Sequence, residues 1–269
     1  MTATHEVVAY RLEPTTAEPA ASIAYITLDD PSRRNALSDT LLDQLSEALS
    51  AAAADATVRV IVLTSSHDRV FSSGGNLDAF ADQRPTIIKY QGLTRFPALY
   101  RQLTQIEKPI VCAANGDVLA GALGIALACD LVIAKKSIRL GCPEISIGAF
   151  PFMISALIFR ATGRLQANDL MMTGRLVSAD EARVLGLVNE VVQDSEFEDR
   201  VTQFVNGIAE RSPLLIGLGK RALAATRDMG FDAALDHLQA QLALAFTTND
   251  LVEGVTAFKE KRAPRWRNT

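Results

Sequence analysis

Short apolar runs separated by turn-forming residues occupy the first 150 positions of the chain. Six of these runs have the length and composition of strands: residues 7–12, 23–28, 58–63, 109–114, 131–134 and 138–141. Residues 58–63 (VRVIVL) and 109–114 (PIVCAA) are nearly continuous apolar runs, which are typical of strands buried on both faces. The pattern therefore predicts a sheet that is largely covered.

Two segments between these runs have helical patterns. Six apolar residues between Leu41 and Ala52 recur at helical spacing, and Ser38 or Asp39 can cap the helix that they predict. Residues 120–129 (AGALGIALAC) are apolar around the whole circumference of a helix, so we expect an internal helix there. Strands that alternate with helices predict an α/β core.

Beyond Pro151 the pattern becomes helical throughout. Residues 178–181 (SADE) form a capping box, and Gly186 is expected to end that short helix. Four longer amphipathic helices are predicted at residues 196–211, 213–229, 231–247 and 250–262. Since little sheet is left for their apolar positions to cover, association between subunits is one way to bury them.

Composition and charge narrow the functional classes. The 269 residues are 48% hydrophobic and 22% charged, as in folded proteins, and the formal net charge is −4. This charge argues against a protein that neutralises nucleic-acid phosphates. The three cysteines have no metal-ligand spacing, the chain opens without a signal-peptide pattern, and the apolar stretch 110–134 is interrupted by polar residues. We expect a cytoplasmic protein with reduced thiols and no membrane span.

Two loops have the composition of backbone donor sites. Gly74 and Gly75 follow a predicted strand in the loop 71–77 (FSSGGNL), and adjacent glycines let backbone N–H groups approach a ligand. The loop 115–122 leads into the internal helix, whose first N–H groups lack intrahelical partners. Either loop can instead be a tight turn or a close packing contact.

A third segment, residues 140–148, carries the acid Glu144 among apolar residues. Apolar surroundings raise the pKa of a carboxyl group and make it a usable proton-transfer group. The alternative is a solvated carboxylate at the end of a strand. Two donor loops and one such acid are together the parts needed to stabilise an enolate.

Five motifs identify a family: residues 35–38 (NALS), 71–77, 115–130, 141–144 (GCPE) and 253–262 (EGVTAFKEKR). In their order and spacing the chain resembles the crotonase superfamily, the enoyl-CoA hydratase/isomerase family, from about residue 20 to residue 266. The resemblance implies a spiral of ββα turns in residues 1–195 and an all-α trimerisation region in residues 196–269. It also implies trimers or dimers of trimers, an acyl-CoA substrate, and no cofactor besides the CoA of that substrate.

The resemblance also implies roles for individual residues. The N–H groups of Gly75 and Gly121 form an oxyanion hole for the thioester oxygen, and Glu144 is the general acid/base. The residues implied in CoA or substrate binding are Arg33, Arg34, Ser73, Gly74, Asn76, Leu77, Phe258 and Lys261, the last of which can also serve a neighbouring subunit's ligand. Phe152, in the apolar segment that follows the acid, is expected to line the acyl pocket.

The chain departs from the family pattern at one position. The best-studied hydratases of the family use two glutamates, and the first of them falls on Gly124 here. We expect hydration of 2-enoyl-CoA with Glu144 alone; the mechanistic alternative is a Δ3,Δ2-enoyl-CoA isomerase, which needs only one acid. An alternative of another class is a catalytically silent acyl-CoA-binding homologue. An RNA-binding relative is disfavoured by the net charge, and a dienoyl-CoA isomerase by the lack of an acid in residues 148–152.

Two other residues near these loops were considered for chemistry. Asp117 could replace the missing carboxylate but is interpreted as a turn residue, and Cys142 is interpreted as packing because no histidine is near in sequence. The acyl chain length, the pathway and the choice between trimer and hexamer stay open.

Overall fold

The computed structural model describes residues 5–18, 20–75 and 85–269 and contains two sheets. The larger sheet has the order β1-β2-β3-β5-β7-β10 and is parallel apart from the antiparallel pair β1 and β2. Its strands are β1 (Val8–Pro14), β2 (Ser22–Leu28), β3 (Val58–Ser65), β5 (Ile110–Ala114), β7 (Leu131–Lys135) and β10 (Glu190–Val192). The predicted buried strands β3 and β5 are neighbours in its centre.

The smaller sheet has the order β4-β6-β8-β9. Its strands have three residues each: β4 (Val70–Ser72), β6 (Asp117–Leu119), β8 (Arg139–Gly141) and β9 (Leu176–Ser178). The expectation that only helices follow Pro151 was wrong at β9 and β10. Both strands complete sheets that begin far earlier in the chain, so their partners, and not their own sequences, define them.

Successive turns of chain repeat one unit. Each turn gives a strand to the larger sheet, a strand to the smaller sheet and then one or two helices: β3 and β4 precede α3 and α4, β5 and β6 precede α5, and β7 and β8 precede α6 and α7. These helices are α3 (Thr86–Leu93), α4 (Arg95–Gln105), α5 (Gly121–Ala128), α6 (Phe152–Ala161) and α7 (Arg164–Thr173). The predicted spiral of ββα turns is confirmed.

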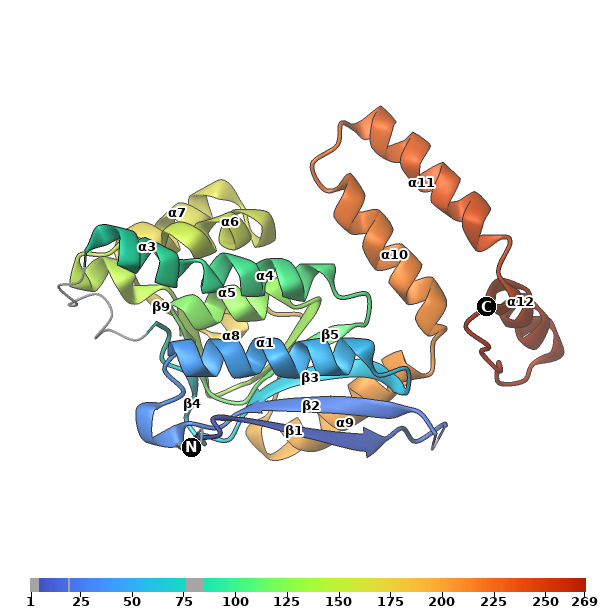
Figure 1. Cartoon of the computed structure of the whole chain (residues 1–269), viewed down its shortest axis with the longest axis horizontal. Helices are drawn as coiled ribbons and strands as arrows, with labels where there is room; N and C mark the ends of the chain where they lie inside the picture. Colours follow the sequence, from blue (N-terminus) through green and yellow to red (C-terminus); the bar gives the residue numbers. More distant parts are fainter. Residues whose placement is uncertain (1–4, 19, 76–84) are drawn as a thin grey trace.

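Helices cover both faces of the larger sheet (Figure 1). On one face, α1 (Asp39–Ala54), α4 and α5 contribute to the main apolar cluster, which also includes Ile26, Leu63 and Ile110. On the other face, α9 (Phe197–Ala209) packs Phe197, Val201 and Val205 against the sheet. The helix α5 is buried nearly all round, as its composition predicts.

Side-chain caps begin several helices as predicted. Ser38 accepts a hydrogen bond from the N–H of Leu41 at the start of α1, and Ser178 accepts one from Glu181 at the start of α8 (Ala179–Val184). Three short 3₁₀ helices complete this part of the fold: η1 (Pro31–Arg33), η2 (Pro143–Ile147) and η3 (Asp194–Glu196).

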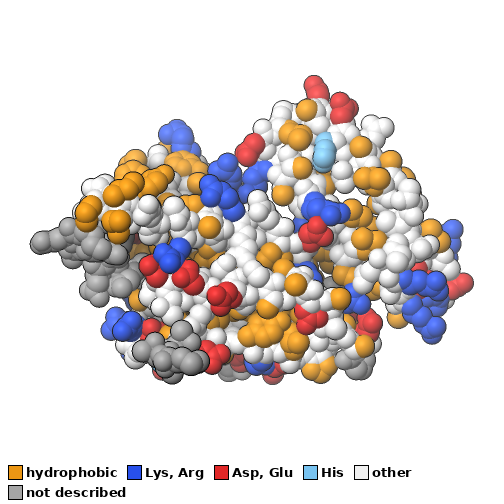
Figure 2. All heavy atoms as spheres, viewed as in Figure 1, with side chains coloured by type: hydrophobic (Ala, Val, Ile, Leu, Met, Phe, Trp, Pro, Cys, Tyr) orange, Lys and Arg blue, Asp and Glu red, His pale blue; other side chains and the backbone are white. Residues whose placement is uncertain are grey.

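The last three helices form an arm that extends from the core (Figure 1). They are α10 (Pro213–Thr226), α11 (Phe231–Ala245) and α12 (Asn249–Glu260). Lys220 holds α10 to the core through Asp130 (2.5 Å) and the carbonyl of Lys108 (2.8 Å). No residue of α11 is buried, and Figure 2 shows hydrophobic side chains on the visible face of the arm. The division of the chain at residues 195 and 196 stays a prediction.

Candidate active site

A buried asparagine fixes the first loop of the site. Asn35 is fully buried, and its side-chain oxygen accepts a hydrogen bond from the N–H of Asp30 (2.7 Å). Its side-chain nitrogen donates to Ser65 Oγ (2.7 Å) and to the carbonyl of Phe71 (3.0 Å). These bonds tie the loop that contains Arg33 and Arg34 to the ends of β3 and β4.

The glycine loop is held by the same segment. Ser72 Oγ donates to the carbonyl of Asn35 (2.7 Å) and accepts from the N–H of Gly74 (3.2 Å). The carbonyl of Gly74 accepts from the N–H of Leu37 (2.8 Å), and the N–H of Ser73 donates to the carbonyl of Arg34 (3.0 Å). Among the described residues, no hydrogen bond uses the N–H of Gly75.

The two predicted donor loops meet at Gly74. A Cβ atom there would lie 2.5 Å from Ala120 Cβ and 3.3 Å from the backbone nitrogen of Gly121. Only glycine fits, because the space is closed and φ is +89°. The structure therefore brings the loop of Gly75 against the first residue of α5, which is the arrangement that an oxyanion hole requires.

Backbone strain lies next to the second donor. Ala120, the residue before α5, has φ +53° and ψ −128°, a conformation that non-glycine residues rarely adopt. The N–H of Gly121 follows this residue at the start of the helix, where N–H groups have no intrahelical acceptor. Across the described part of the chain, no hydrogen bond uses this N–H either. Strain of this kind is held in place where backbone groups must point in a fixed direction.

Glu144 lies in the first turn of η2, directly after β8. Its Oε2 atom is buried and has no hydrogen-bond partner within the described residues. Burial raises the pKa of this carboxyl group, and a hydrogen bond from its own backbone N–H partly opposes the rise. The direction agrees with the expectation from its apolar neighbours.

Burial and the charge of Glu144 raise the pKa of two nearby neutral side chains, Cys142 and Tyr100. Burial raises the pKa of the Cys142 thiol to about 12, and the charge of Glu144 adds to the rise. A thiol with such a pKa is not a nucleophile at neutral pH, which supports the interpretation of Cys142 as packing. Burial and the charge of Glu144 likewise raise the pKa of Tyr100 well above its usual value.

The position of the missing glutamate is filled by other side chains. A Cβ atom on Gly124 would lie 2.5 Å from Tyr100 Oη and 2.6 Å from Ile154 Cγ2. Tyr100 Oη donates a hydrogen bond to the carbonyl of Gly121 (3.0 Å). Sequence reasoning missed Tyr100, whose only signal is its position on the buried face of the amphipathic helix α4.

The carboxylate of Asp117, unlike that of Glu144, is held by hydrogen bonds to a neighbouring strand. It accepts hydrogen bonds from the N–H of Arg139 (2.7 Å) and from the Arg139 guanidinium (2.8 Å). The side chain therefore links β6 to β8, and Asp117 is a residue of strand β6, so the interpretation as a turn residue was wrong.

The remaining predicted substrate-binding residues have different positions. Arg33 and Arg34 are exposed beside the glycine loop. Phe152 begins α6 with 76% of its surface exposed, and its ring centroid lies 5.2 Å from that of Phe150. Asn76 and Leu77 lie outside the described residues.

Phe258 and Lys261 lie at the end of α12, which Figure 1 shows apart from α5. Phe258 is 85% exposed, and it lines an apolar hollow of about 330 Å³ together with Leu215 and Trp266. Within one chain the structure therefore does not bring these two residues to Gly75, Gly121 and Glu144.

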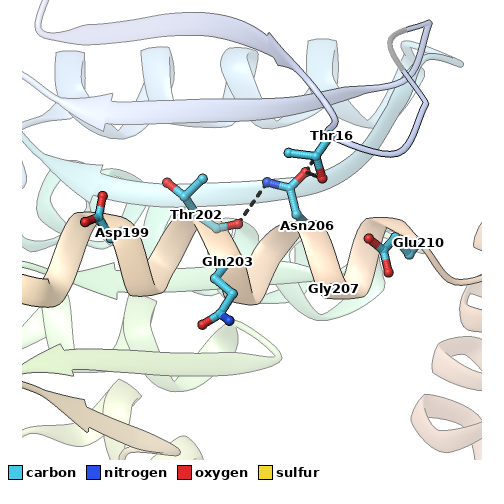
Figure 3. Close-up of a pocket in the computed structure, with 7 residues that line it drawn as sticks. All are labelled: Thr16, Asp199, Thr202, Gln203, Asn206, Gly207 and Glu210. Carbon is cyan, nitrogen blue, oxygen red and sulfur yellow. Dashed lines mark hydrogen bonds between the residues drawn. The ribbon is translucent and has the colours of Figure 1, made fainter.

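A larger hollow, of about 480 Å³, lies on α9 (Figure 3). Asn206, at its centre, accepts hydrogen bonds from the N–H (2.8 Å) and hydroxyl (3.1 Å) of Thr16 and donates to the carbonyl of Thr202 (2.9 Å). Its polar groups thus fasten the turn between β1 and β2 to α9. Neither predicted donor loop nor Glu144 lines this hollow, so it is not a candidate for the active site.

The described residues contain neither a metal site nor a membrane-spanning helix. No group of three or more His, Cys, Asp or Glu side chains in this part of the chain is arranged to hold a metal ion. None of its helices has the length and apolar character needed to span a membrane.

Known proteins resemble this chain over nearly its whole length. Residues 18–269 match the family model described as enoyl-CoA hydratase/isomerase. A Thermus thermophilus protein provisionally named as an enoyl-CoA hydratase is 36% identical over 247 residues, which cover 91% of this chain and 97% of that protein. A short-chain-enoyl-CoA hydratase of Clostridium acetobutylicum is 30% identical over 246 residues, which cover 91% and 94%.

A solved structure is similar to this chain over almost its whole length as well. The crystal structure of an enoyl-CoA hydratase from Bacillus anthracis matches with a TM-score of 0.90 and 27% identity, and the match covers 98% of this chain and 100% of that one.

Proposed function

The chain belongs to the enoyl-CoA hydratase/isomerase family, and from this premise we propose that it adds water to 2-enoyl-CoA thioesters to give 3-hydroxyacyl-CoA. Relatives named as hydratases support this reaction, among them the short-chain-enoyl-CoA hydratase of Clostridium acetobutylicum. The observation that carries the proposal is the buried oxygen of Glu144, which has no hydrogen-bond partner among the described residues, together with two backbone N–H groups that no hydrogen bond between described residues uses.

The two N–H groups stabilise charge in the reaction. Attack of water at Cβ moves the Cα=Cβ electrons toward the thioester and places negative charge on its oxygen. The N–H groups of Gly75 and Gly121 bind this oxygen as an enolate oxyanion. Removal of one such donor slows comparable reactions by roughly a hundred- to thousandfold.

Glu144 moves the protons. As a carboxylate it accepts a proton from the attacking water while the O–Cβ bond forms. As a carboxylic acid it then returns that proton to Cα, and the enolate electrons form the new Cα–H bond. Its raised pKa suits both steps, because a group with a pKa closer to neutral pH gives up and accepts protons more readily.

The substrate's CoA is proposed to lie along the exposed Arg33 and Arg34, whose guanidinium groups match phosphate oxygens. Phe258 and Lys261 are proposed to reach the CoA of a neighbouring subunit in a trimer, since they lie apart from Glu144 in one chain. Phe152 is proposed to line the acyl pocket. The chemistry uses only a carboxyl group and backbone N–H groups, so we propose that no cofactor beyond the substrate's CoA takes part.

A second candidate is the Δ3,Δ2-enoyl-CoA isomerase reaction. It is favoured by the closed space at Gly124, which leaves one carboxyl group at the site. Movement of a double bond requires one group that carries a proton from Cα to Cγ, and Glu144 alone can do this.

The test is a pair of substrates in deuterated water. Crotonyl-CoA and 3-hexenoyl-CoA are incubated separately with the protein, and products are identified by mass. Addition of one heavy water to crotonyl-CoA supports hydration. Conversion of 3-hexenoyl-CoA to its 2-enoyl isomer without addition of water, seen by the absorbance of the conjugated thioester and by deuterium uptake, supports isomerisation if crotonyl-CoA stays unchanged.

Glu144→Gln is the matched variant, with Glu47→Gln on the exposed face of α1 as its control. The first variant should lose roughly a hundred- to ten-thousandfold in rate, and the control should keep the wild-type rate. If the wild-type protein leaves both substrates unchanged but binds them, the acyl-CoA-binding alternative replaces both reactions.

A further inference from the structure

Tyr100 is a buried polar side chain that the mechanism above does not use. It lies on the inward face of α4 with 7% of its surface exposed. Its hydroxyl donates to the carbonyl of Gly121, the same residue whose N–H faces the proposed thioester oxygen. The hydroxyl also lies 3.8 Å from the point where a Cβ atom on Gly121 would stand. It is therefore part of the surface around the proposed oxyanion hole.

The Tyr100 hydroxyl also occupies the space that a side chain at position 124 would need. It lies 2.5 Å from the Cβ position of Gly124, and Ile154 closes the other side at 2.6 Å. A carboxylate on residue 124 would start from this point. In its place the chain puts a phenol oxygen, carried by a different helix.

The Tyr100 phenol is neutral at neutral pH. Burial first, and the negative charge of Glu144 second, raise its pKa well above the usual value near 10. Its hydrogen is already donated to Gly121, so the lone pairs of its oxygen are what it offers to the site. No donor among the described residues occupies them.

We propose that Tyr100 Oη is the second acceptor for the attacking water, in the role that a carboxylate at position 124 would have. This inference rests on the proposed hydration reaction. One hydrogen of the water points to the Glu144 carboxylate, which takes it as a proton. The other hydrogen bonds to Tyr100 Oη and stays on the oxygen that joins Cβ, so Tyr100 binds the reacting water and neither gains nor loses a proton.

The proposal predicts that Tyr100 affects two reactions of the same site differently. Hydration needs a water held at Cβ, whereas removal of a proton from Cα of a 3-enoyl-CoA needs only Glu144 and the oxyanion donors. Loss of the Tyr100 hydroxyl should therefore slow hydration and spare the second reaction. A change that merely disturbs Gly121 would slow both reactions, because both use its N–H.

The experiment compares Tyr100→Phe with wild type on two substrates. Phenylalanine keeps the ring that packs near Phe96 and removes only the oxygen. Hydration of crotonyl-CoA should fall by roughly ten- to a hundredfold in kcat, as expected when a reacting group loses its position. Deuterium uptake or double-bond movement in 3-hexenoyl-CoA should stay within about threefold of wild type, since that step keeps its acid/base.

Tyr25→Phe is the matched control, because Tyr25 is a buried tyrosine on β2 that packs against α9. It should leave both rates unchanged. The proposal is overturned if Tyr100→Phe hydrates crotonyl-CoA at the wild-type rate, or if both reactions fall by the same factor. Wild-type protein that does not hydrate crotonyl-CoA would instead contradict the proposed function.

Discussion

Glu144 keeps one carboxylate oxygen buried and without a hydrogen-bond partner in the described part of the chain, which favours its neutral form. A folded-state pKa above the unfolded value of 4.5 means that the folded protein binds this proton more tightly. The resulting stability is complete below pH 4.5 and is lost as the pH rises through the folded-state pKa. Above its folded-state pKa the charged Glu144 therefore destabilises the fold.

Glu144→Gln should raise the free energy of unfolding at pH 8, because glutamine has no charge to bury. The gain over wild type should shrink as the pH is lowered toward 4.5, where the wild-type carboxyl is protonated in the folded protein. Urea unfolding at several pH values measures it, with Glu47→Gln as the exposed control. A gain that is the same at pH 8 and pH 4.5 would contradict the assignment of the burial penalty to this group.

Gly124→Ala should destabilise the protein although alanine normally stabilises a helix. The added methyl group meets Tyr100 Oη and Ile154 at 2.5 and 2.6 Å, and overpacking of this kind costs about 1–3 kcal/mol. Gly207→Ala in α9 is the control: nothing lies within 4 Å of its Cβ position, so it should stabilise by about 0.5–1 kcal/mol. Urea unfolding at one protein concentration compares them, and stabilisation by both substitutions would show that the space at Gly124 is open.

At the scale of residues, sequence reasoning predicts those parts of the site that depend on short segments. Gly74, Gly75 and Glu144 each stand out within a few positions, as small residues after a strand or as an acid among apolar neighbours. Tyr100 does not, because it reaches the site from a helix some twenty residues before Gly124. Nothing in the spacing around a tyrosine on an amphipathic helix tells a core position from a site position.

At the scale of elements, the site depends on the junction between η1, β3 and β4. Asn35→Ala removes three side-chain hydrogen bonds and leaves the N–H of Asp30 and the Ser65 hydroxyl without this partner. It also places alanine at φ +50°, which asparagine tolerates better. We expect a loss of about 2–4 kcal/mol in the free energy of unfolding.

The same substitution should lower kcat, because the Asn35 side chain fixes the loop whose backbone carbonyl accepts a hydrogen bond from Ser72 Oγ. Ser72 Oγ in turn accepts from the N–H of Gly74. Ser46→Ala on α1 is the control, because it removes a half-buried side-chain hydrogen bond to Gln102 that lies away from this junction. Its free energy of unfolding should fall by about 0.5–1.5 kcal/mol, with kcat unchanged. Unfolding curves and initial rates measure the two effects. An Asn35→Ala variant with wild-type kcat would show that the junction does not orient the donor loop.

Elements differ in how far their own sequences define them. The helix α1 is predicted from its apolar spacing and its cap, and β3 and β5 from their apolar runs. The three-residue strands of the smaller sheet have no period to detect, and they exist because neighbouring turns of the spiral place them side by side. Since β6 leads directly into Ala120 and Gly121, the local pattern alone could not give the direction of the N–H of Gly121, the second donor of the proposed oxyanion hole.

At the scale of the molecule, one chain exposes more surface than a compact monomer. Its accessible area is 14619 Å², whereas a compact protein of 29.0 kDa exposes about 11,400 Å². In the arm of α10–α12, the apolar side chains of Leu223, Phe231 and Leu242 are more than half exposed. A surface of this size and composition is typical of one that other subunits cover.

Light scattering should therefore give a mass of three or six times 29.0 kDa for the purified protein. Leu242→Asp should lower that mass, since a buried charge without a partner opposes association. Gln239→Asp, at an exposed polar position of the same helix, is the control and should keep the wild-type mass. A wild-type mass of one chain would rule out the trimer and leave Phe258 and Lys261 without a ligand to reach.

The whole-molecule arrangement is the part that local patterns predict least. The four C-terminal helices look alike in sequence, yet α9 covers the larger sheet and α10–α12 extend away from it. The difference depends on the surface that each helix packs against. The helix α9 packs on the sheet face formed by Tyr25, Val60 and Ile133, whereas α11 has no such face to pack on and no buried residue.

The filled space at Gly124 also has an evolutionary consequence. A substitution of this glycine by glutamate would drive the new side chain into Tyr100 and Ile154. Smaller residues at positions 100 and 154 would have to come first to make room for it. A single substitution therefore cannot turn this site into one with two carboxylates, and packing constrains the order in which such substitutions can accumulate.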